Sequence, residues 1–247
     1  MQKIIAHITD THIDDPTALT RGINPRQNLG VLLEDLAQRK PDELVFTGDA
    51  GIPGSYGWLF DKMAEYQPNF RLTLGNHDDY SEAMQFYSGK TEGNGELYYT
   101  TEDDFYKYLY LDSSSGSLST AQLSWLEGEL HTSRKVIIFV HHPILGFPTG
   151  MDTKYPLTNR DSVVALLSES RKDITVFCGH YHMPDKRKQN NITQYITPAV
   201  SFQVRKASPG IDIFTQHFGY RLITLTETRI STELILNFYD HFTSKRG

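Results

Sequence analysis

The segment KVIIFVHH, residues 135–142, carries the strongest strand pattern in the chain. Its apolar residues run without interruption and end in two histidines followed by Pro143. A continuous apolar run of this length is typical of a strand that is buried on both faces of a parallel sheet. We therefore expect a buried strand here, with His141 and His142 at its carboxyl end.

Four other segments share this pattern of a short apolar run with polar residues at its end. They are KIIAHIT at 3–9, LVFTG at 44–48, RLTLG at 71–75 and ITVFCGH at 174–180. Helical patterns lie between them, and Pro25 opens one at 25–39. Further helices are predicted at 55–66, after the capping pair Ser119 and Gln122, and at 160–171. Alternating strands and helices are the pattern of a parallel sheet with helices on both faces.

The rest of the chain is rich in β-favouring residues. Residues 97–112 hold two aromatic runs split by a Glu-Asp-Asp turn, which predicts two adjacent strands. Further strands are predicted at ITQYITP (192–198), GYRLITLTE (219–227) and RISTELILNFY (229–239). We expect one α/β domain over residues 1–247, since no linker divides the chain. Its expected architecture is a two-sheet α/β/β/α sandwich, in which strands from the first and last thirds pack against each other with helices outside.

The charge balance is acidic, with 24 Lys and Arg against 30 Asp and Glu and a formal net charge of −6. A field of this sign disfavours binding to nucleic acid, although bound divalent cations would still attract a small phosphate. The apolar run at the N-terminus is too short for a signal peptide, and no stretch approaches the roughly 18 to 20 apolar residues of a membrane helix. Together with the single cysteine, Cys178, these features predict a cytoplasmic protein without a membrane partner.

Metal-ligating side chains follow the predicted strands. Five groups stand at strand ends: Asp10 and His12, Asp49, Asn76 and His77, His141 and His142, and His180 and His182. The carboxyl ends of strands in an open α/β sheet converge on one crevice, so these groups should surround a common point. Carboxylate oxygens mixed with imidazole nitrogens suit Mn, Fe, Zn or Co. About seven ligands match two ions roughly 3.5 to 4 Å apart that share one carboxylate.

The motifs D-x-H, G-D, G-N-H-D, H-x-P and G-H-x-H, in this order, resemble those of the calcineurin-like metallophosphoesterase superfamily. The later segment TPAVSFQVRK…GYRLITL and the spacing resemble the class III cyclic-nucleotide phosphodiesterases and the related glycerophosphodiesterases. The resemblance implies two ligand sets and a bridge: Asp10, His12 and His182 for one metal, Asn76, His141 and His180 for the other, and Asp49 between them. It selects His141 over its neighbour because one residue separates it from Pro143, which leaves His142 for a supporting contact.

The resemblance also implies a reaction, the two-metal hydrolysis of a small phosphodiester, with a 3′,5′-cyclic nucleotide as the favoured substrate. Two cations would lower the pKa of a shared water to give a metal-bridging hydroxide and would stabilise the in-line transition state. His77 matches the family histidine that faces the phosphate, and it is the expected catalytic residue that helps the leaving oxygen depart. A homodimer is expected from the family alone.

The same metal ligands leave other functions open. A phosphomonoesterase, a nucleotide pyrophosphatase or a lipid-precursor hydrolase would use the same centre with a different pocket. A noncatalytic metal-binding scaffold is disfavoured, because every ligand and His77 are present.

Two stretches, each next to one of the motifs, have both a structural and a functional interpretation. The family commonly continues its G-D motif with an aliphatic residue and often another acid, whereas Ala50 and Gly51 follow here. This departure bears on the expected pocket wall and on substrate preference. The basic run at 186–188 is expected in a solvated turn, with contact to a substrate phosphate as the alternative. Arg205 and Lys206 are interpreted in the same way.

Other residues near the motifs receive mainly structural predictions. Tyr155, Phe202 and Tyr181 are candidates for stacking on a nucleobase, and Tyr181 is the one we retain. Asp78 and Asp79 are expected in a loop or at a helix cap. The histidines outside the motifs are expected to have structural roles: His7, His131, His217 and His241.

Overall fold

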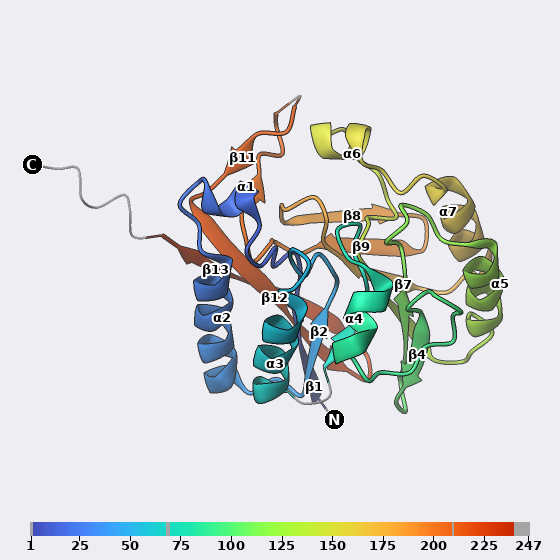
Figure 1. Ribbon diagram of the computed structural model, residues 1–247. Helices are drawn as coiled ribbons and strands as arrows, with labels where there is room; N and C mark the ends of the chain where they lie inside the picture. Colours follow the sequence, from blue (N-terminus) through green and yellow to red (C-terminus); the bar gives the residue numbers. More distant parts are fainter. Residues whose placement is uncertain (1, 68–69, 209, 240–247) are drawn as a thin grey trace, which may run out of the picture.

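The computed structural model describes residues 2–67, 70–208 and 210–239, and two sheets lie at its centre (Figure 1). The first sheet has the strand order β13 (Ile230–Phe238), β12 (His217–Thr226), β1 (Gln2–Ile8), β2 (Glu43–Phe46), β3 (Arg71–Leu72). The second has the order β4 (Tyr99–Glu102), β5 (Tyr106–Leu111), β6 (Lys135–Val140), β7 (Ile174–Cys178), β9 (Ile192–Ile196), β8 (Asp185–Gln189). A separate ribbon pairs β10 (Gln203–Val204) with β11 (Ile213–Phe214). The predicted two-sheet α/β class is confirmed.

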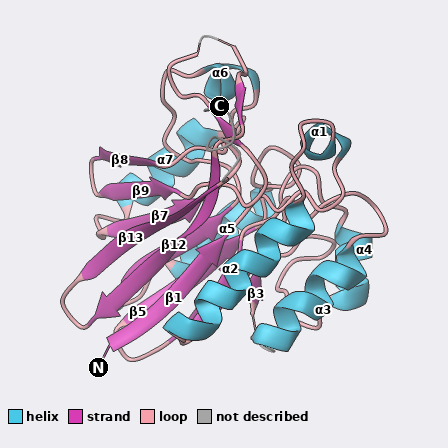
Figure 2. Cartoon of the chain, turned by 90° about the vertical axis from the view of Figure 1, so that its left-hand side faces the viewer, coloured by secondary structure: helices cyan, strands magenta, loops and turns pink. Residues whose placement is uncertain are grey.

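Helices lie outside the two sheets (Figures 1 and 2). The helices on the side of the first sheet are α2 (Pro25–Arg39) and α3 (Tyr56–Tyr66), and those on the side of the second are α5 (Thr120–Glu129) and α7 (Arg160–Glu169). Three short helices complete the set: α1 (Pro16–Leu19), α4 (Tyr80–Phe86) and α6 (Gly150–Lys154). Within the described residues, no helix has the length and apolar character needed to cross a bilayer.

Local sequence signals fix the ends of several helices. Asn24 caps α2 by accepting a hydrogen bond from the backbone N–H of Gln27, and Pro25 occupies the first turn, as predicted. Ser119 caps α5 in the same way through the N–H of Gln122. Helix α4 was not predicted, but Asp79 is its cap, which confirms that part of the prediction. Its short length gives little periodicity to detect.

The first and last thirds of the chain are arranged differently from the prediction. They do not pack on each other from opposite sheets, since β12 is hydrogen-bonded to β1 within one sheet and places Ile223 opposite Ile5. On its other side β1 pairs in parallel with β2. The late strand therefore closes an edge of β1 that would otherwise leave backbone groups unpaired. The second sheet is formed by the strands between Tyr99 and Ile196.

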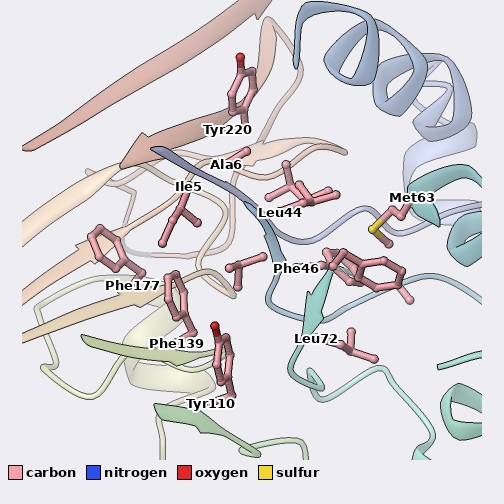
Figure 3. Packing of buried hydrophobic residues seen from close by; sticks show 14 of the residues in the cluster. Ile5, Ala6, Leu44, Phe46, Met63, Leu72, Tyr110, Phe139, Phe177 and Tyr220 are labelled. Atoms are coloured by element: carbon pink, nitrogen blue, oxygen red, sulfur yellow. The ribbon is translucent and has the colours of Figure 1, made fainter. Parts of the chain in front are cut away.

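A row of aromatic rings crosses the second sheet and supports the core. Residues directly opposite one another on successive strands form this aromatic row: Tyr99, Tyr110, Phe139, Phe177 and Tyr195. Neighbouring ring centroids are 4.5 to 5.5 Å apart, a spacing at which stacked rings attract. Figure 3 shows three of these rings in one row beside Ile5 of the first sheet. The row thus connects β6 and β7, which precede His141 and His180, to the other strands of the second sheet.

Strand β8 corrects the prediction for residues 186–188. They do not form a turn, because β8 pairs antiparallel with β9 at the edge of the second sheet. Lys186 and Arg187 lie over aromatic rings, with Lys186 Nζ 5.3 Å from the ring centroid of Tyr195. Lysine on an edge strand discourages pairing with another chain, which is a structural reason for this composition.

Candidate metal centre

The carboxyl ends of the central strands bring the predicted acidic and histidine ligands together. Two clusters have all their ligating atoms within 4.8 Å of one another: Asp10, His12, Asp49 and His182 in one, and Asp49, His141 and His180 in the other. Asp49 belongs to both clusters, and all six side chains are buried. The sheet geometry therefore produces one common point, with a shared carboxylate at its centre.

The loops that carry these residues have an uncommon backbone conformation. Positive φ angles occur at Asp10 (55°), His12 (45°), Asp49 (56°), His180 (66°) and His182 (50°). Residues other than glycine rarely adopt this region, and each such residue costs on the order of 1–3 kcal/mol. Backbone hydrogen bonds between loops offset this strain, since Asp10 N donates to Gly48 O and His12 N to Asp49 O, each at 3.0 Å. The clusters are thus held in place by the surrounding fold.

A glycine makes room for the second loop. A Cβ atom at Gly179 would lie 2.0 Å from Thr9 Oγ1 and 2.4 Å from Asp10 Oδ2. Thr9 Oγ1 donates to that same oxygen at 2.7 Å. The glycine before His180 therefore allows the loop to approach the Asp10 carboxylate closely.

Hydrogen bonds to backbone carbonyls fix the protonation of three histidine rings. The pairs are His141 Nδ1 with Thr47 O (2.7 Å), His180 Nε2 with Tyr155 O (3.0 Å) and His182 Nδ1 with Phe202 O (2.8 Å). A carbonyl oxygen only accepts, so the ring nitrogen that faces it must carry the hydrogen. The other nitrogen of each neutral ring then presents a bare lone pair to the cluster, as in metal-binding histidines.

These lone pairs face one another in two places. His12 Nδ1 lies 3.3 Å from the carboxylate of Asp15, which only accepts, so the Nε2 of a neutral His12 ring is also bare. His12 Nε2 lies 3.2 Å from His182 Nε2, and His141 Nε2 lies 3.2 Å from His180 Nδ1. Two bare nitrogens at this distance repel unless a cation or a proton lies between them. Asp49 Oδ2 lies 3.4 Å from His12 Nε2 and 3.3 Å from His141 Nε2. The donor set thus fits two metal ions, with this carboxylate placed between the two pairs.

The electrostatics of the clusters favour bound positive charge. Burial alone would raise the pKa of Asp49, but the adjacent His141 and His12 hold it well below its usual range. Burial would lower the pKa of His141, yet Asp49 and Asp10 raise it to about 9. At neutral pH the metal-free cluster therefore keeps a proton on His141, in the position that a cation would take.

Two supporting acids were not identified as positioning residues from the sequence. Asp78 accepts hydrogen bonds from the backbone N–H groups of Asp49 (2.7 Å), Ala50 (2.8 Å) and Gly75 (2.8 Å). It thereby joins the loop after β2 to the loop after β3. Asp15 Oδ2 lies 3.3 Å from the outer nitrogen of His12. The sequence could have indicated the role of Asp78, because this residue is the last of the G-N-H-D motif. No motif contains Asp15, so its role could not be predicted.

A cavity of about 290 Å³ opens above the two clusters. Asn76 and His77 line it and are exposed to solvent. The backbone N–H of His77 donates to Asp49 Oδ1 at 3.0 Å, and its ring centroid is 5.3 Å from that of His12. The predicted catalytic histidine is therefore at the mouth of the site and is connected to the shared carboxylate.

The aromatic prediction is only partly supported. Tyr155 and Phe202 line the cavity, whereas Tyr181 does not. Tyr181 is fully buried, packs on Phe147 and donates its hydroxyl hydrogen to Asp152. Its ring cannot stack on a substrate, so the choice of Tyr181 was wrong. In this irregular segment after β7, packing on Phe147 and the hydrogen bond to Asp152 set the orientation of the ring.

The remaining expectations concern residues around the site. Neither Ala50 nor Gly51 lines the cavity, and Gly51 approaches Ile13 so closely that a Cβ would lie 2.5 Å from its carbonyl oxygen. The departure after G-D therefore affects packing and not the cavity wall. The basic residues at 205 and 206 are paired with acids: Arg205 with Asp212, and Lys206 with Asp185.

The histidines outside the motifs divide into three cases. His7 is structural as predicted, because its ring is hydrogen-bonded on both sides, to Thr47 Oγ1 at 2.8 Å and Thr197 Oγ1 at 2.7 Å. His131 and His217 take no part in the two clusters. His241 lies outside the described residues.

The chain is similar in sequence and in fold to known proteins. Residues 4–184 match the family model described as calcineurin-like phosphoesterase. A probable cyclic nucleotide phosphodiesterase from Fibrobacter succinogenes is 31% identical, over 93% of this chain and 92% of that protein. A probable glycerophosphodiester phosphodiesterase from Arcobacter nitrofigilis is 27% identical, over 81% and 80%. A dimetal phosphatase structure from Danio rerio has the same fold, with a TM-score of 0.64 at 15% identity, over 93% of this chain and 98% of that chain.

The family model covers most of the chain, and both buried clusters lie within the matched residues 4–184. The donor set fits two metal ions on the grounds of ring protonation given above. The chain therefore belongs to the calcineurin-like phosphoesterase family and is a metal-dependent phosphoesterase.

Proposed function

We propose that this chain is a two-metal phosphodiesterase whose favoured substrate is a 3′,5′-cyclic nucleotide. The observation that carries the proposal is the pair of facing imidazole contacts with Asp49 between them, at the floor of an open cavity. Similarity to the probable cyclic nucleotide phosphodiesterase from Fibrobacter succinogenes supports the substrate. The proposal takes residues 1–247 as one domain, which agrees with the pairing of β1 and β12.

The proposed ligands divide between two metal ions. One ion would be held by Asp10, His12 and His182, the other by Asn76, His141 and His180, and Asp49 would contact both. Asp10 Oδ1 lies 3.2 Å from His182 Nε2, which supports its place in the first set. Asn76 lines the cavity together with His180, which supports its place in the second. Mn, Fe, Zn and Co all suit this mixture of oxygen and nitrogen donors.

The chain's own residues would perform the remaining chemistry. When bound, the two ions supply positive charge for the phosphoryl oxygens and make a water molecule more acidic. His77 stands at the edge of the cavity, where an N–H group can donate a proton to the departing ester oxygen. Its backbone bond to Asp49 keeps the ring beside the clusters. Hydrolysis would then yield a phosphomonoester and an alcohol, or one nucleotide from a cyclic diester.

Apolar side chains above the clusters support an aromatic substituent on the substrate. The cavity lining includes Met151, Tyr155, Phe202, Ile211 and Ile213. A flat nucleobase against these side chains would bury apolar area and could stack on an aromatic ring. The second candidate is a glycerophosphodiesterase, favoured by the similarity to the Arcobacter nitrofigilis protein.

The test compares three substrates of the Mn-loaded protein: cyclic AMP, bis(p-nitrophenyl) phosphate and p-nitrophenyl phosphate. We expect both diesters to be hydrolysed faster than the monoester, and Asn76→Ala to lose this activity. The control Asn94→Ala changes an exposed loop residue that does not line the cavity, and it should keep the wild-type rate. Preference for the monoester would support a phosphomonoesterase. If the aryl diester is hydrolysed but cyclic AMP is not, the phosphodiesterase reaction is supported and the cyclic substrate is rejected.

A further inference from the structure

Two cavities meet at the candidate metal centre. The first is the 290 Å³ cavity described above, whose walls carry Met151, Phe202, Ile211 and Ile213 and which we call the apolar lobe. The second has a volume of about 270 Å³ and is lined by Ser114, Ser115, Gly116, His142, Lys154 and Thr158, and we call it the polar lobe. Both are also lined by Asn76, Tyr155 and His180, so they open on the same centre from two sides.

The polar lobe contains a buried ring with an unused nitrogen. His142 is 3% exposed, and its Nδ1 lies 2.9 Å from Ser113 Oγ. Its ring centroid is 4.1 Å from that of His180, which places it beside the second metal cluster. Within the described residues, His142 Nε2 has no hydrogen-bond partner, although the ring lines the lobe. This nitrogen is not among the fully buried unpaired atoms of the described residues, so it is open to the lobe, where a ligand hydroxyl could bond to it.

Two further groups in the polar lobe have no hydrogen-bond partner among the described residues. The Ser114 hydroxyl makes no hydrogen bond to any described residue, since only the backbone N–H of this serine is bonded, to Asp112. The Lys154 ammonium contacts the ring of Tyr155, 5.2 Å from its centroid, but pairs with no carboxylate in the described part of the chain. Lys154 is also the only lysine or arginine among the residues that line either lobe. A hydroxyl, an imidazole nitrogen and an ammonium group thus surround one space.

We propose that the polar lobe is a second substrate subsite, which binds the hydroxyl-bearing alcohol of a linear phosphodiester while the apolar lobe binds the other ester group. The proposal rests on the proposed function, because the phosphate must lie at the metal clusters between the lobes. Hydroxyl groups both donate and accept hydrogen bonds, so they satisfy all three unpaired groups. A cyclic diester, whose two ester oxygens belong to one sugar, would use only the apolar lobe, so the polar lobe would extend the proposed activity to linear diesters.

The reaction on a linear diester needs no further reactant. The oxygen of water bonds to phosphorus, the bond from phosphorus to one alcohol oxygen breaks, and a proton from the water ends on that oxygen. The products are a phosphomonoester and a free alcohol. Specificity then depends on Lys154 and Ser114, which lie outside the metal clusters.

The subsite is tested by binding, independently of turnover. Titration calorimetry of the Mn-loaded protein would compare glycerol 3-phosphate with propyl phosphate, which lacks its two hydroxyl groups. We expect glycerol 3-phosphate to bind about tenfold more tightly. Lys154→Met and Ser114→Ala should each reduce this ratio toward one. Lys62→Met, on the outer surface of α3 and paired with Glu65, should keep it. Equal affinities in the wild type, or an unchanged ratio in both variants, would overturn the subsite.

A second measurement separates the subsite from the proposed function. Glyceryl p-nitrophenyl phosphate and propyl p-nitrophenyl phosphate are linear diesters that differ in the same two hydroxyl groups, and we expect kcat/KM to be higher for the glyceryl ester. If the propyl ester is hydrolysed but the two ligands bind equally, the subsite fails and the phosphodiesterase stands. If the binding ratio is about ten but neither ester is hydrolysed, the subsite stands and the phosphodiesterase fails.

Discussion

The floor of the cavity and its rim are built differently. The floor consists of buried side chains on loops that follow the central strands, and hydrogen bonds to carbonyl or carboxylate oxygens orient its rings. The rim consists of short elements, α6 and the β10–β11 ribbon, and α6 and β11 project beyond the sheets at one end of the molecule (Figure 1). Tyr155 and Ile211 on the rim are exposed by 43% and 39%. A rim of this kind can change without moving the floor, so reaction and specificity are encoded in separate parts of the chain.

The largest effect should come from the centre of the floor. Asp49→Asn keeps the shape of the side chain but removes the charge between the two clusters, so we expect turnover of the aryl diester to fall on the order of 10⁴-fold. Bound Mn, measured by elemental analysis, should fall below two ions per chain. Asp104→Asn, at an exposed position in the β4–β5 turn, should change neither quantity. If Asp49→Asn retained two ions and the wild-type rate, the floor would not be the reactive part.

The aromatic row beneath the floor should dominate stability. Phe139 is fully buried and stacks on Tyr110 and Phe177, each at 5.5 Å. We expect Phe139→Ala to lower the free energy of unfolding by about 3–5 kcal/mol, because it leaves a cavity between the sheets. Tyr155→Ala on the rim should change it by less than about 0.5 kcal/mol. Urea unfolding measures both, and equal losses would contradict the separation of floor and rim.

The sequence revealed the floor far better than the rim. Asp10, His141 and His180 follow continuous apolar strands, and parallel topology brings such positions to one edge, so their convergence followed from pattern alone. The pairing of β1 with β12 in one sheet could not be predicted in this way, because strand pairing between distant segments leaves no local signal in the sequence. The positive φ angles of five site residues were equally invisible, since tertiary hydrogen bonds impose them.

The rim was predicted poorly for related reasons. Tyr181 was preferred over Tyr155 and Phe202, although only the latter two line the cavity. The orientation of a side chain in an irregular loop depends on packing partners that the sequence does not reveal. The basic run in β8 was misassigned because its charged composition is untypical of strands. The structure is therefore needed mainly for short elements, whose conformation local sequence does not determine.

Acid should weaken metal binding by the floor. The pKa of His141 in the metal-free cluster is raised to about 9, so a cation must displace its proton below that pH. Affinity for Mn should therefore fall about tenfold for each pH unit between pH 8 and pH 7 and become nearly constant above about pH 9. Competition with a chelator of known affinity, at several pH values, measures this slope. An affinity independent of pH between 7 and 8 would show that the floor carries no displaceable proton.

The smallest effect should come from the rim, and it tests whether the rim selects the substrate. Ile211 precedes β11 and lines the apolar lobe, so Ile211→Ser removes apolar contact area from a bound nucleobase. A loss of about 1 kcal/mol in binding corresponds to a rise of roughly fivefold in KM for cyclic AMP. The value of kcat should stay within about twofold, because the reacting groups belong to the floor. Ile52→Ser is the matched control, since Ile52 is 38% exposed, nearly as much as Ile211, but does not line the lobe. A change confined to KM in the Ile211 variant would assign recognition to the rim. An equal fall in kcat would show instead that the rim acts on the transition state, and the division between the two regions would have to be abandoned.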